Sequence, residues 1–178
     1  MKSSKGSLLV SGASLMDPNF HRKVLFVVEH DLQGALAVVL NDPLALHPEQ
    51  LIDLWADHVE KDGFIYRGGP VSANAVIGLA KSLKANEKSL VGSTEVIDLH
   101  HSPSDRPDIE VIRLFVGYAG WSAGQLEKEL KEGSWFIFKA KESDIFTNNV
   151  ETLWETVLRR QGGIVSQMAG APEDLSAN

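Results

Sequence analysis

Short apolar runs, each about as long as a buried β-strand, dominate the pattern of hydrophobic and polar positions along this chain. They predict strands over residues 7–12, 24–29, 35–40, 64–67, 75–79, 95–99, 111–116 and 135–138. Only residues 30–34, with a turn over 31–34, separate the second run from the third. A link that short requires an antiparallel hairpin, because a parallel crossover needs about a dozen residues or more.

Helical periodicity appears between these runs. After Pro48, a residue suited to a first helical turn, apolar side chains recur at helical spacing as far as His58. Residues 150–158 carry an apolar stripe, with Asn148 as the expected N-terminal cap. The tail from about residue 166 is small and polar, and we expect it to be flexible.

Residues 117–133 predict a strand end, a glycine turn and a helix start. Ser122 is the expected N-cap, and Gln125, three residues later, completes a capping box. Trp121 and Leu126 occupy the two positions of a hydrophobic staple. Strand-to-helix turns of this kind often carry functional sites, because loops on a rigid scaffold present binding residues.

The same turn contains the pattern G-x-S-x-G around Ser122, which is typical of the nucleophile elbow of α/β hydrolases. Those enzymes place the acid and then the histidine after the serine. The last histidine of this chain, His101, comes before Ser122. We therefore interpret Ser122 as a helix cap and not as a nucleophile.

Composition limits the classes of function. The chain has 178 residues, a length typical of a single domain over 1–178, and its formal net charge is −7. Its longest basic cluster is the pair Arg159-Arg160, so direct binding to nucleic acid is disfavoured. There is no cysteine, which excludes disulfides and thiolate metal sites. No apolar run is long enough to span a membrane, and we expect a cytoplasmic protein.

Candidate chemistry begins at the end of the first hairpin, with Glu29 and His30. Consecutive strand residues point to opposite faces, so the two cannot face one ligand while the strand stays regular. His30 is either a titrating site residue or a hydrogen-bonded residue at a strand end. His100 and His101 lie in a Pro-containing loop, and their spacing matches no common metal motif, so no metal and no cofactor are predicted.

Two further features have a structural and a functional interpretation. Gly68, Gly69 and Pro70 predict a tight turn with close backbone approach, whose amides could also hold a small anion. Arg113 lies within an apolar strand, where a charge requires a partner. Either Glu29 or Glu110 neutralises it, or it binds an anionic ligand.

Taken together, these segments resemble the YqgE/AlgH family of bacterial proteins. The resemblance rests on GSLLVSGASLMDPNF (6–20), VLFVVEHDLQGALAVVLN (24–41), RGGPV (67–71), FVGYAGWSAGQLEKEL (115–130), GSWF (133–136) and LWETVLRRQGG (153–163). Residues 72–109 match poorly. Asp42 stands where the family often has a basic residue, which weakens any anion site beside it.

The resemblance implies an α+β fold, with a mixed, bifurcated β-sheet that includes a small closed barrel and is surrounded by helices. It implies a bacterial cytosolic protein but no settled activity. One branch of the family carries the label of a transcriptional regulator, without an obvious DNA-binding motif.

We expect a binding or regulatory protein whose site lies where three turns meet, and whose partner is a small molecule or another protein. The candidate ligand-binding residues are Glu29, His30, Asn41, Gly68, Gly69, Pro70, Arg113, Tyr118, Trp121 and Gln125. Two alternatives remain open. One is an enzyme that uses His30 or Glu29 as a general base with Arg113 as an anion clamp, and the other is an indirect transcriptional regulator.

Overall fold

The computed structural model describes residues 2–12, 15, 17–60 and 64–170. Within them, the strands are β1 (Ser7–Ser11), β2 (Val24–Asp31), β3 (Gly34–Val39), β4 (Pro43–Leu44), β5 (Ile65–Arg67), β6 (Val71–Ser82), β7 (Thr94–Ile97), β8 (Ile109–Ser122) and β9 (Trp135–Lys139). The helices are α1 (Gln125–Lys131), α2 (Glu142–Ile145), α3 (Leu153–Arg159) and α4 (Gly163–Met168). None of the described helices is long and apolar enough to cross a membrane. The α+β class is confirmed.

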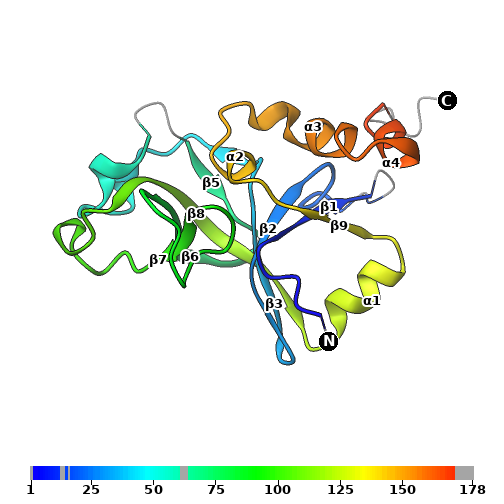
Figure 1. Cartoon of the computed structure of the whole chain (residues 1–178), viewed down its shortest axis with the longest axis horizontal. Helices are drawn as coiled ribbons and strands as arrows, with labels where there is room; N and C mark the ends of the chain where they lie inside the picture. The colour runs from blue at the N-terminus through cyan, green and yellow to red at the C-terminus, as the bar shows by residue number, and fades with distance from the viewer. Residues whose placement is uncertain (1, 13–14, 16, 61–63, 171–178) are drawn as a thin grey trace.

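The strands form one mixed sheet that branches at β8, the longest strand (Figure 1). The end of β8 pairs with β3, and the sheet continues through β2 and β1 to β9. The earlier part of β8 pairs with β5 in parallel and with β6 in antiparallel orientation, and β7 follows β6. The hairpin predicted for the second and third runs is confirmed as β2 and β3.

The expected closed barrel is wrong. The main path of strands ends at β4 and β9, and its branch ends at β7. Among the described residues, no strand pair joins these ends. Closure requires every strand to have two hydrogen-bonded neighbours. β4 has two residues and β7 has four, so these strands are too short to extend the sheet into a ring.

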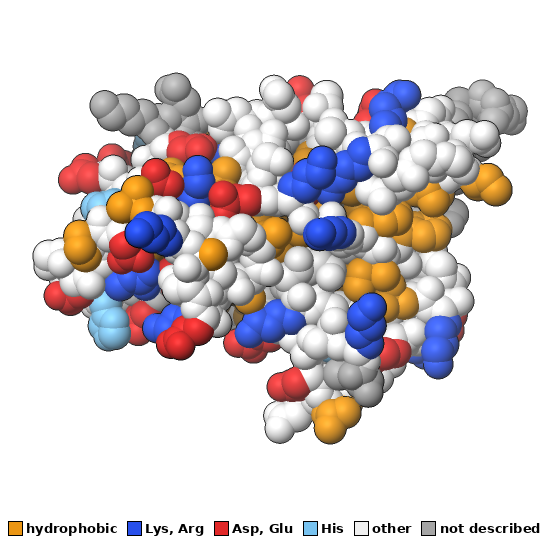
Figure 2. Space-filling model, viewed as in Figure 1, with side chains coloured by type: hydrophobic (Ala, Val, Ile, Leu, Met, Phe, Trp, Pro, Cys, Tyr) orange, Lys and Arg blue, Asp and Glu red, His pale blue; other side chains and the backbone are white. Residues whose placement is uncertain are grey.

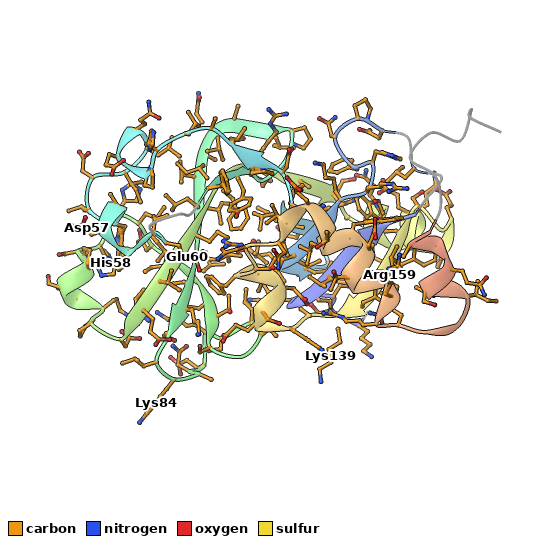
Figure 3. The ribbon with its side chains drawn as sticks, turned by 90° about the horizontal axis from the view of Figure 1, so that it is seen from above. Asp57, His58, Glu60, Lys84, Lys139 and Arg159 are labelled. Carbon is orange, nitrogen blue, oxygen red and sulfur yellow. The ribbon has the colours of Figure 1, made fainter. Side chains whose placement is uncertain are left out.

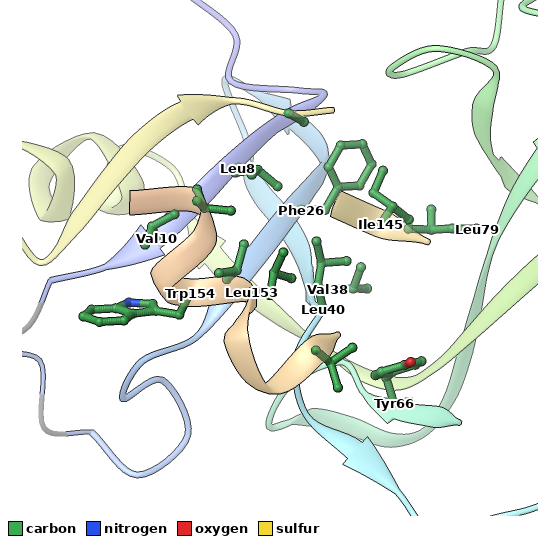
Figure 4. Close-up of a cluster of buried hydrophobic side chains, with 14 of the residues drawn as sticks. Leu8, Val10, Phe26, Val38, Leu40, Tyr66, Leu79, Ile145, Leu153 and Trp154 are labelled. Carbon is green, nitrogen blue, oxygen red and sulfur yellow. The ribbon is translucent and has the colours of Figure 1, made fainter. Parts of the chain in front are cut away.

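Helices cover both faces of the β1–β2–β3–β9 part of the sheet. In Figure 1, α3 and α4 lie above it and α1 lies below it. On the α3 side, Leu153 and Trp154 pack against strand residues that include Val10 and Phe26 (Figure 4). On the α1 side, Leu126 packs with a second apolar cluster. Successive side chains of each strand point to opposite faces of the sheet, so the same strands contribute residues to both clusters, as expected for strands that are buried on both faces.

A third apolar cluster lies under residues 48–60, where a single helix was predicted. That helix does not form. The segment contains two 3-10 turns, Pro48–Gln50 and Ala56–His58. Trp55 is fully buried, whereas Leu54 is 55% exposed. The segment is therefore held by the packing of Trp55 and not by the apolar face of an amphipathic helix.

Other elements begin or end at residues that differ from the sequence prediction. The 150–158 stripe forms a 3-10 turn, Val150–Thr152, followed by α3, and Asn148 does not cap it. Asn148 instead accepts a 3.4 Å hydrogen bond from Arg113. The tail predicted to be flexible from about residue 166 still belongs to α4 as far as Met168, and residues 171–178 lie outside the described part.

Charged side chains of both signs are spread over the face shown in Figure 2, and hydrophobic side chains gather over β9 and beside α4. Ile137 on β9 and Ile164 on α4 are among the exposed large hydrophobic residues. β9 is also an edge of the sheet.

Candidate functional site

The turn between β5 and β6 crosses β8 at close range. A Cβ on Gly68 would lie 2.2 Å from the carbonyl oxygen of Gly117, and one on Gly69 would lie 2.2 Å from the carbonyl carbon of Tyr118. Gly117 has a φ of +72°, a conformation that favours glycine. The predicted close backbone approach is therefore present, and it brings Pro70 beside the last residues of β8.

A cavity of about 440 Å³ opens beside this crossing. We call it the aromatic pocket. Its lining residues come from Leu15 and the 17–20 segment, the β5–β6 turn, the end of β8, α1 with the residues after it, and the start of β9. They are Leu15, Asp17, Phe20, Pro70, Val71, Gly120, Trp121, Gln125, Glu129, Glu132, Ser134 and Trp135. Of the ten predicted site residues, the structure brings Pro70, Trp121 and Gln125 together here.

Aromatic rings form one wall of the aromatic pocket. Trp121 and Trp135 meet edge to face, with ring centroids 6.0 Å apart. Phe20 packs against Trp135 in the same manner, at 5.3 Å. Such perpendicular contacts suit the quadrupoles of the rings and hold them in fixed orientations.

The carboxylate of Glu129 fixes both indoles. Its Oε2 accepts hydrogen bonds from Trp121 Nε1 at 2.8 Å and from Trp135 Nε1 at 2.9 Å. Its Oε1 accepts a third bond, from Gln125 Nε2 at 2.9 Å. Glu129 was not among the residues that the sequence predicted for the site. Its spacing of four residues from Gln125 on one helix face was the available signal, whereas its contact with Trp135 needed the fold.

The turn before α1 is built differently from the predicted capping box. The N-cap is Gly124, with a φ of +75°, and Ser122 still belongs to β8. Gln125 Oε1 accepts bonds from the backbone amide and the hydroxyl of Ser122, at 3.1 and 3.2 Å. The capping interpretation of Ser122 is therefore wrong, although its hydroxyl has a structural partner. Trp121 and Leu126 do pack in one cluster, as the staple predicted.

His30 lies close to the aromatic pocket but does not line it. It pairs with Ala35, which pairs with Trp121, so His30 is two strand spacings, or about 10 Å, from Trp121. Its Nδ1 accepts a 2.9 Å bond from the Ser4 amide, and its Nε2 lies 3.1 Å from Glu127 Oε1. The ring is buried and has two partners, so it ties the N-terminal segment to α1.

Two other predicted residues lie apart from the aromatic pocket. Glu29 is exposed beside a bulge in β2. Asn41 follows the opposite end of β3, and six residues of strand span about 20 Å. Asn41 accepts a 2.9 Å bond from the Val24 amide and donates one to the Arg22 carbonyl. It holds the loop before β2, and it lines a second cavity of about 480 Å³ with Trp154.

Arg113 is buried in the other branch of the sheet. Its guanidinium donates to the carbonyls of Ile145 and Thr147, at 2.7 and 2.8 Å, and to Glu60 Oε2, at 2.9 Å. Neither Glu29 nor Glu110 is its partner. The eight residue steps from Arg113 to Trp121 would span roughly 25 Å of straight strand, so the structure does not bring Arg113 to His30.

Tyr118 packs on the opposite face of the sheet, against the cluster that contains Trp154. Its neighbours Ala119 and Trp121 belong to the α1-side cluster, as the alternation of strand residues requires. The ring of Tyr118 therefore does not enter the aromatic pocket.

Another cavity, of about 550 Å³, lies at the other end of the molecule between residues 44–49, residues 56–60 and Phe64. Figure 3 shows Asp57, His58 and Glu60 together at this end, with Lys139 and Arg159 toward the other. Glu60 is already bound to Arg113. In the described part of the chain, no group of three or more His, Asp or Glu side chains is placed to hold a metal ion.

Comparison with known proteins places this fold in a recognised group. Residues 8–166 match the model of a family described as AlgH-like (DUF179). A UPF0301 protein of Streptomyces coelicolor is 36% identical, over 100% of this chain and 97% of its own length. Another, from Mycobacteroides abscessus, is 38% identical, over 97% of this chain and 87% of its own length.

Solved structures agree with the sequence comparison. The crystal structure of protein DIP2367 from Corynebacterium diphtheriae superimposes with a TM-score of 0.86 at 26% identity, covering 95% of this chain and 92% of that one. The solution structure of the AlgH protein from Pseudomonas aeruginosa gives a TM-score of 0.70 at 25% identity, with coverages of 96% and 95%.

Proposed function

Because this chain belongs to the AlgH-like family, a group of bacterial proteins without an assigned reaction, we propose that it is a non-catalytic binding protein whose aromatic pocket holds a small organic ligand. One observation carries the proposal. Two tryptophans, a glutamine and a glutamate from three separate elements converge on a single cavity, joined by hydrogen bonds through Glu129.

The dimensions and chemistry of the aromatic pocket support this function. Its volume of about 440 Å³ lies within the usual range for small-molecule sites. Aromatic walls with a few fixed polar groups are also typical of such sites. The walls are held by hydrogen bonds and ring contacts before any ligand arrives, which lowers the entropic cost of binding.

A pair of matched substitutions tests the proposal. Val71 lines the aromatic pocket and is 37% exposed, whereas Val96 lies on β7, outside this pocket, and is 44% exposed. Val71→Trp places a large ring at the pocket mouth, and Val96→Trp makes the same change on a similar surface elsewhere.

The measurement is a thermal-shift screen against amines, carboxylates, sugars and nucleotides. A ligand present at about 100 times its Kd stabilises by about 2.7 kcal/mol, which raises Tm by roughly 5–10 °C in a domain of this size. We expect the shift to be lost in Val71→Trp and kept in Val96→Trp. A shift that survives in both variants, or no shift with any compound, contradicts the proposal.

An enzymatic function has less support. It requires His30 or Glu29 to act with Arg113, and these side chains occupy separate parts of the sheet. His30 and Arg113 are also committed to structural partners. Loss of a measured turnover in His30→Ala, with the fold retained, would favour the enzyme.

A regulatory role in the cytoplasm is compatible with ligand binding, since a bound ligand can change which partner a protein recognises. It predicts that pull-down from a bacterial lysate yields a partner whose recovery changes when the ligand is added. Equal recovery with and without the ligand would argue against it.

A further inference from the structure

We propose that the ligand of the aromatic pocket carries a positively charged N–H group, such as a primary ammonium or a guanidinium, which binds Glu129. This inference rests on the proposed function and adds the chemical class of the ligand. It begins from the charges of the lining. Asp17, Glu129 and Glu132 are acidic, and the lining residues that the structure describes include no lysine or arginine.

The hydrogen bonds of Glu129 leave a vacant acceptor position. A carboxylate offers about four lone-pair sites, two on each oxygen. The two indoles fill both sites of Oε2, and Gln125 fills one site of Oε1. One site of Oε1 therefore has no hydrogen-bond donor among the described residues, and Glu129 lines the aromatic pocket. A carboxylate accepts more strongly from a charged N–H than from a neutral one.

The two other carboxylates also line the aromatic pocket and add to its negative potential. Asp17 is exposed and accepts a bond from the Asn19 amide. Glu132 is exposed, and its surface ion pair with Lys128 spans 3.8 Å. An anionic ligand would have to approach all three carboxylates, and like charges in close contact disfavour binding.

The test uses three probes of similar shape and different charge: phenethylammonium, phenethyl alcohol and phenylacetate. The chain has four tryptophans, and the indole N–H signals in a ¹H–¹⁵N NMR spectrum report on them separately. The indoles of Trp121 and Trp135 contact Glu129. Those of Trp55 and Trp154 bind the carbonyls of His101 and Ser11 and serve as internal controls.

We expect phenethylammonium, titrated at constant ionic strength, to shift the Trp121 and Trp135 signals in a saturable manner, and to leave the Trp55 and Trp154 signals in place. Glu132→Gln and Asp17→Asn each remove one charge without touching the indoles. Each should weaken binding by about two- to fivefold, the range for exposed charges. Glu129→Gln should abolish the shift, and the two milder variants keep the test valid if this variant is misfolded.

Two results would overturn the assignment. Phenethyl alcohol or phenylacetate binding as tightly as the ammonium would reject the cationic class and leave the pocket as a binding site. If no probe shifts the two indole signals, the cationic class is also rejected. The proposed binding function is then tested by the broad thermal-shift screen alone.

Discussion

At the scale of single residues, the local sequence did not reveal which side chains hold the site together. Glu129 looked like an ordinary helix-surface glutamate, yet it accepts three hydrogen bonds from the pocket wall. Arg113 was correctly expected to need a partner, but the partner, Glu60, comes from a loop 53 residues away. A buried charge requires compensation, and only the fold determines which group provides it.

The role of Glu129 gives a prediction about stability. Trp121 and Trp135 are both buried. Glu129→Ala removes the carboxylate that accepts hydrogen bonds from their indole N–H groups. We expect a loss of about 2–4 kcal/mol in the free energy of unfolding, because each orphaned donor costs about 1–3 kcal/mol. Urea denaturation measures it. Glu132→Ala, at the C-cap of the same helix and with only a surface ion pair, should change stability by less than about 0.5 kcal/mol. Equal effects would contradict the role of Glu129.

At the scale of elements, the sequence predicted the strands better than the helices. The apolar runs at 24–29 and 35–40 became β2 and β3, because strands buried on both faces need continuous apolar sequence. The run at 135–138 became β9, an edge strand with one exposed face. The segment 48–60 had helical periodicity and formed two 3-10 turns. Periodicity is a weak guide here, because tertiary packing of Trp55 and Val59 replaces a regular helix face.

The crossing of β8 by the β5–β6 turn gives a prediction at this scale. Gly117 and Gly133 have nearly equal φ values, +72° and +77°. A Cβ on Gly117 would lie 2.6 Å from the Gly69 carbonyl oxygen, whereas one on Gly133 would have no atom within 4 Å. Both alanine variants carry the left-handed strain of about 1–2 kcal/mol. We expect Gly117→Ala to lose about 1–3 kcal/mol more than Gly133→Ala, since it also overpacks the crossing.

Thermal or urea unfolding of the two variants decides this prediction, because their backbone strain cancels in the comparison. Similar stabilities would mean that the turn moves away from β8 at little cost. In that case the crossing would not fix the position of Pro70 in the aromatic pocket.

At the scale of the whole molecule, hydrogen bonds to carboxylates make the stability of the fold depend on pH. A hydrogen bond from Arg106 lowers the pKa of Asp108 from its ordinary value of 3.8. A hydrogen bond from its own backbone amide, and then one from His30, lower the pKa of Glu127 from 4.5. A carboxylate with a lowered pKa stabilises the folded state above its unfolded pKa, and this contribution is lost as pH falls through the folded pKa.

The lowered pKa of Asp108 predicts how the free energy of unfolding changes with pH. Asp108→Asn should be less stable than the wild-type chain at pH 6, and the difference should shrink as pH falls below 3.8, where Asp108 takes up a proton in the wild type. Urea unfolding at a series of pH values measures the difference. A difference that stays constant down to about pH 2 would show that Asp108 acts through packing and not through its charge.

The sequence by itself determined the class of fold, the antiparallel hairpin of β2 and β3, and the presence of a helix soon after Ser122, because these depend on apolar runs and on residues close in the chain. It did not determine the turn before that helix, since β8 continues through Gly117 and Gly120 to Ser122. Its resemblance to a family identified the group but overestimated the closure of the sheet. Only the tertiary structure decided which turns meet. Trp121, Glu129 and Trp135 come from three elements, and their contact depends on the path of β8 across the sheet. Sequence separation carries no information about that path, so His30, Asn41 and Arg113 looked like equal candidates until the fold separated them.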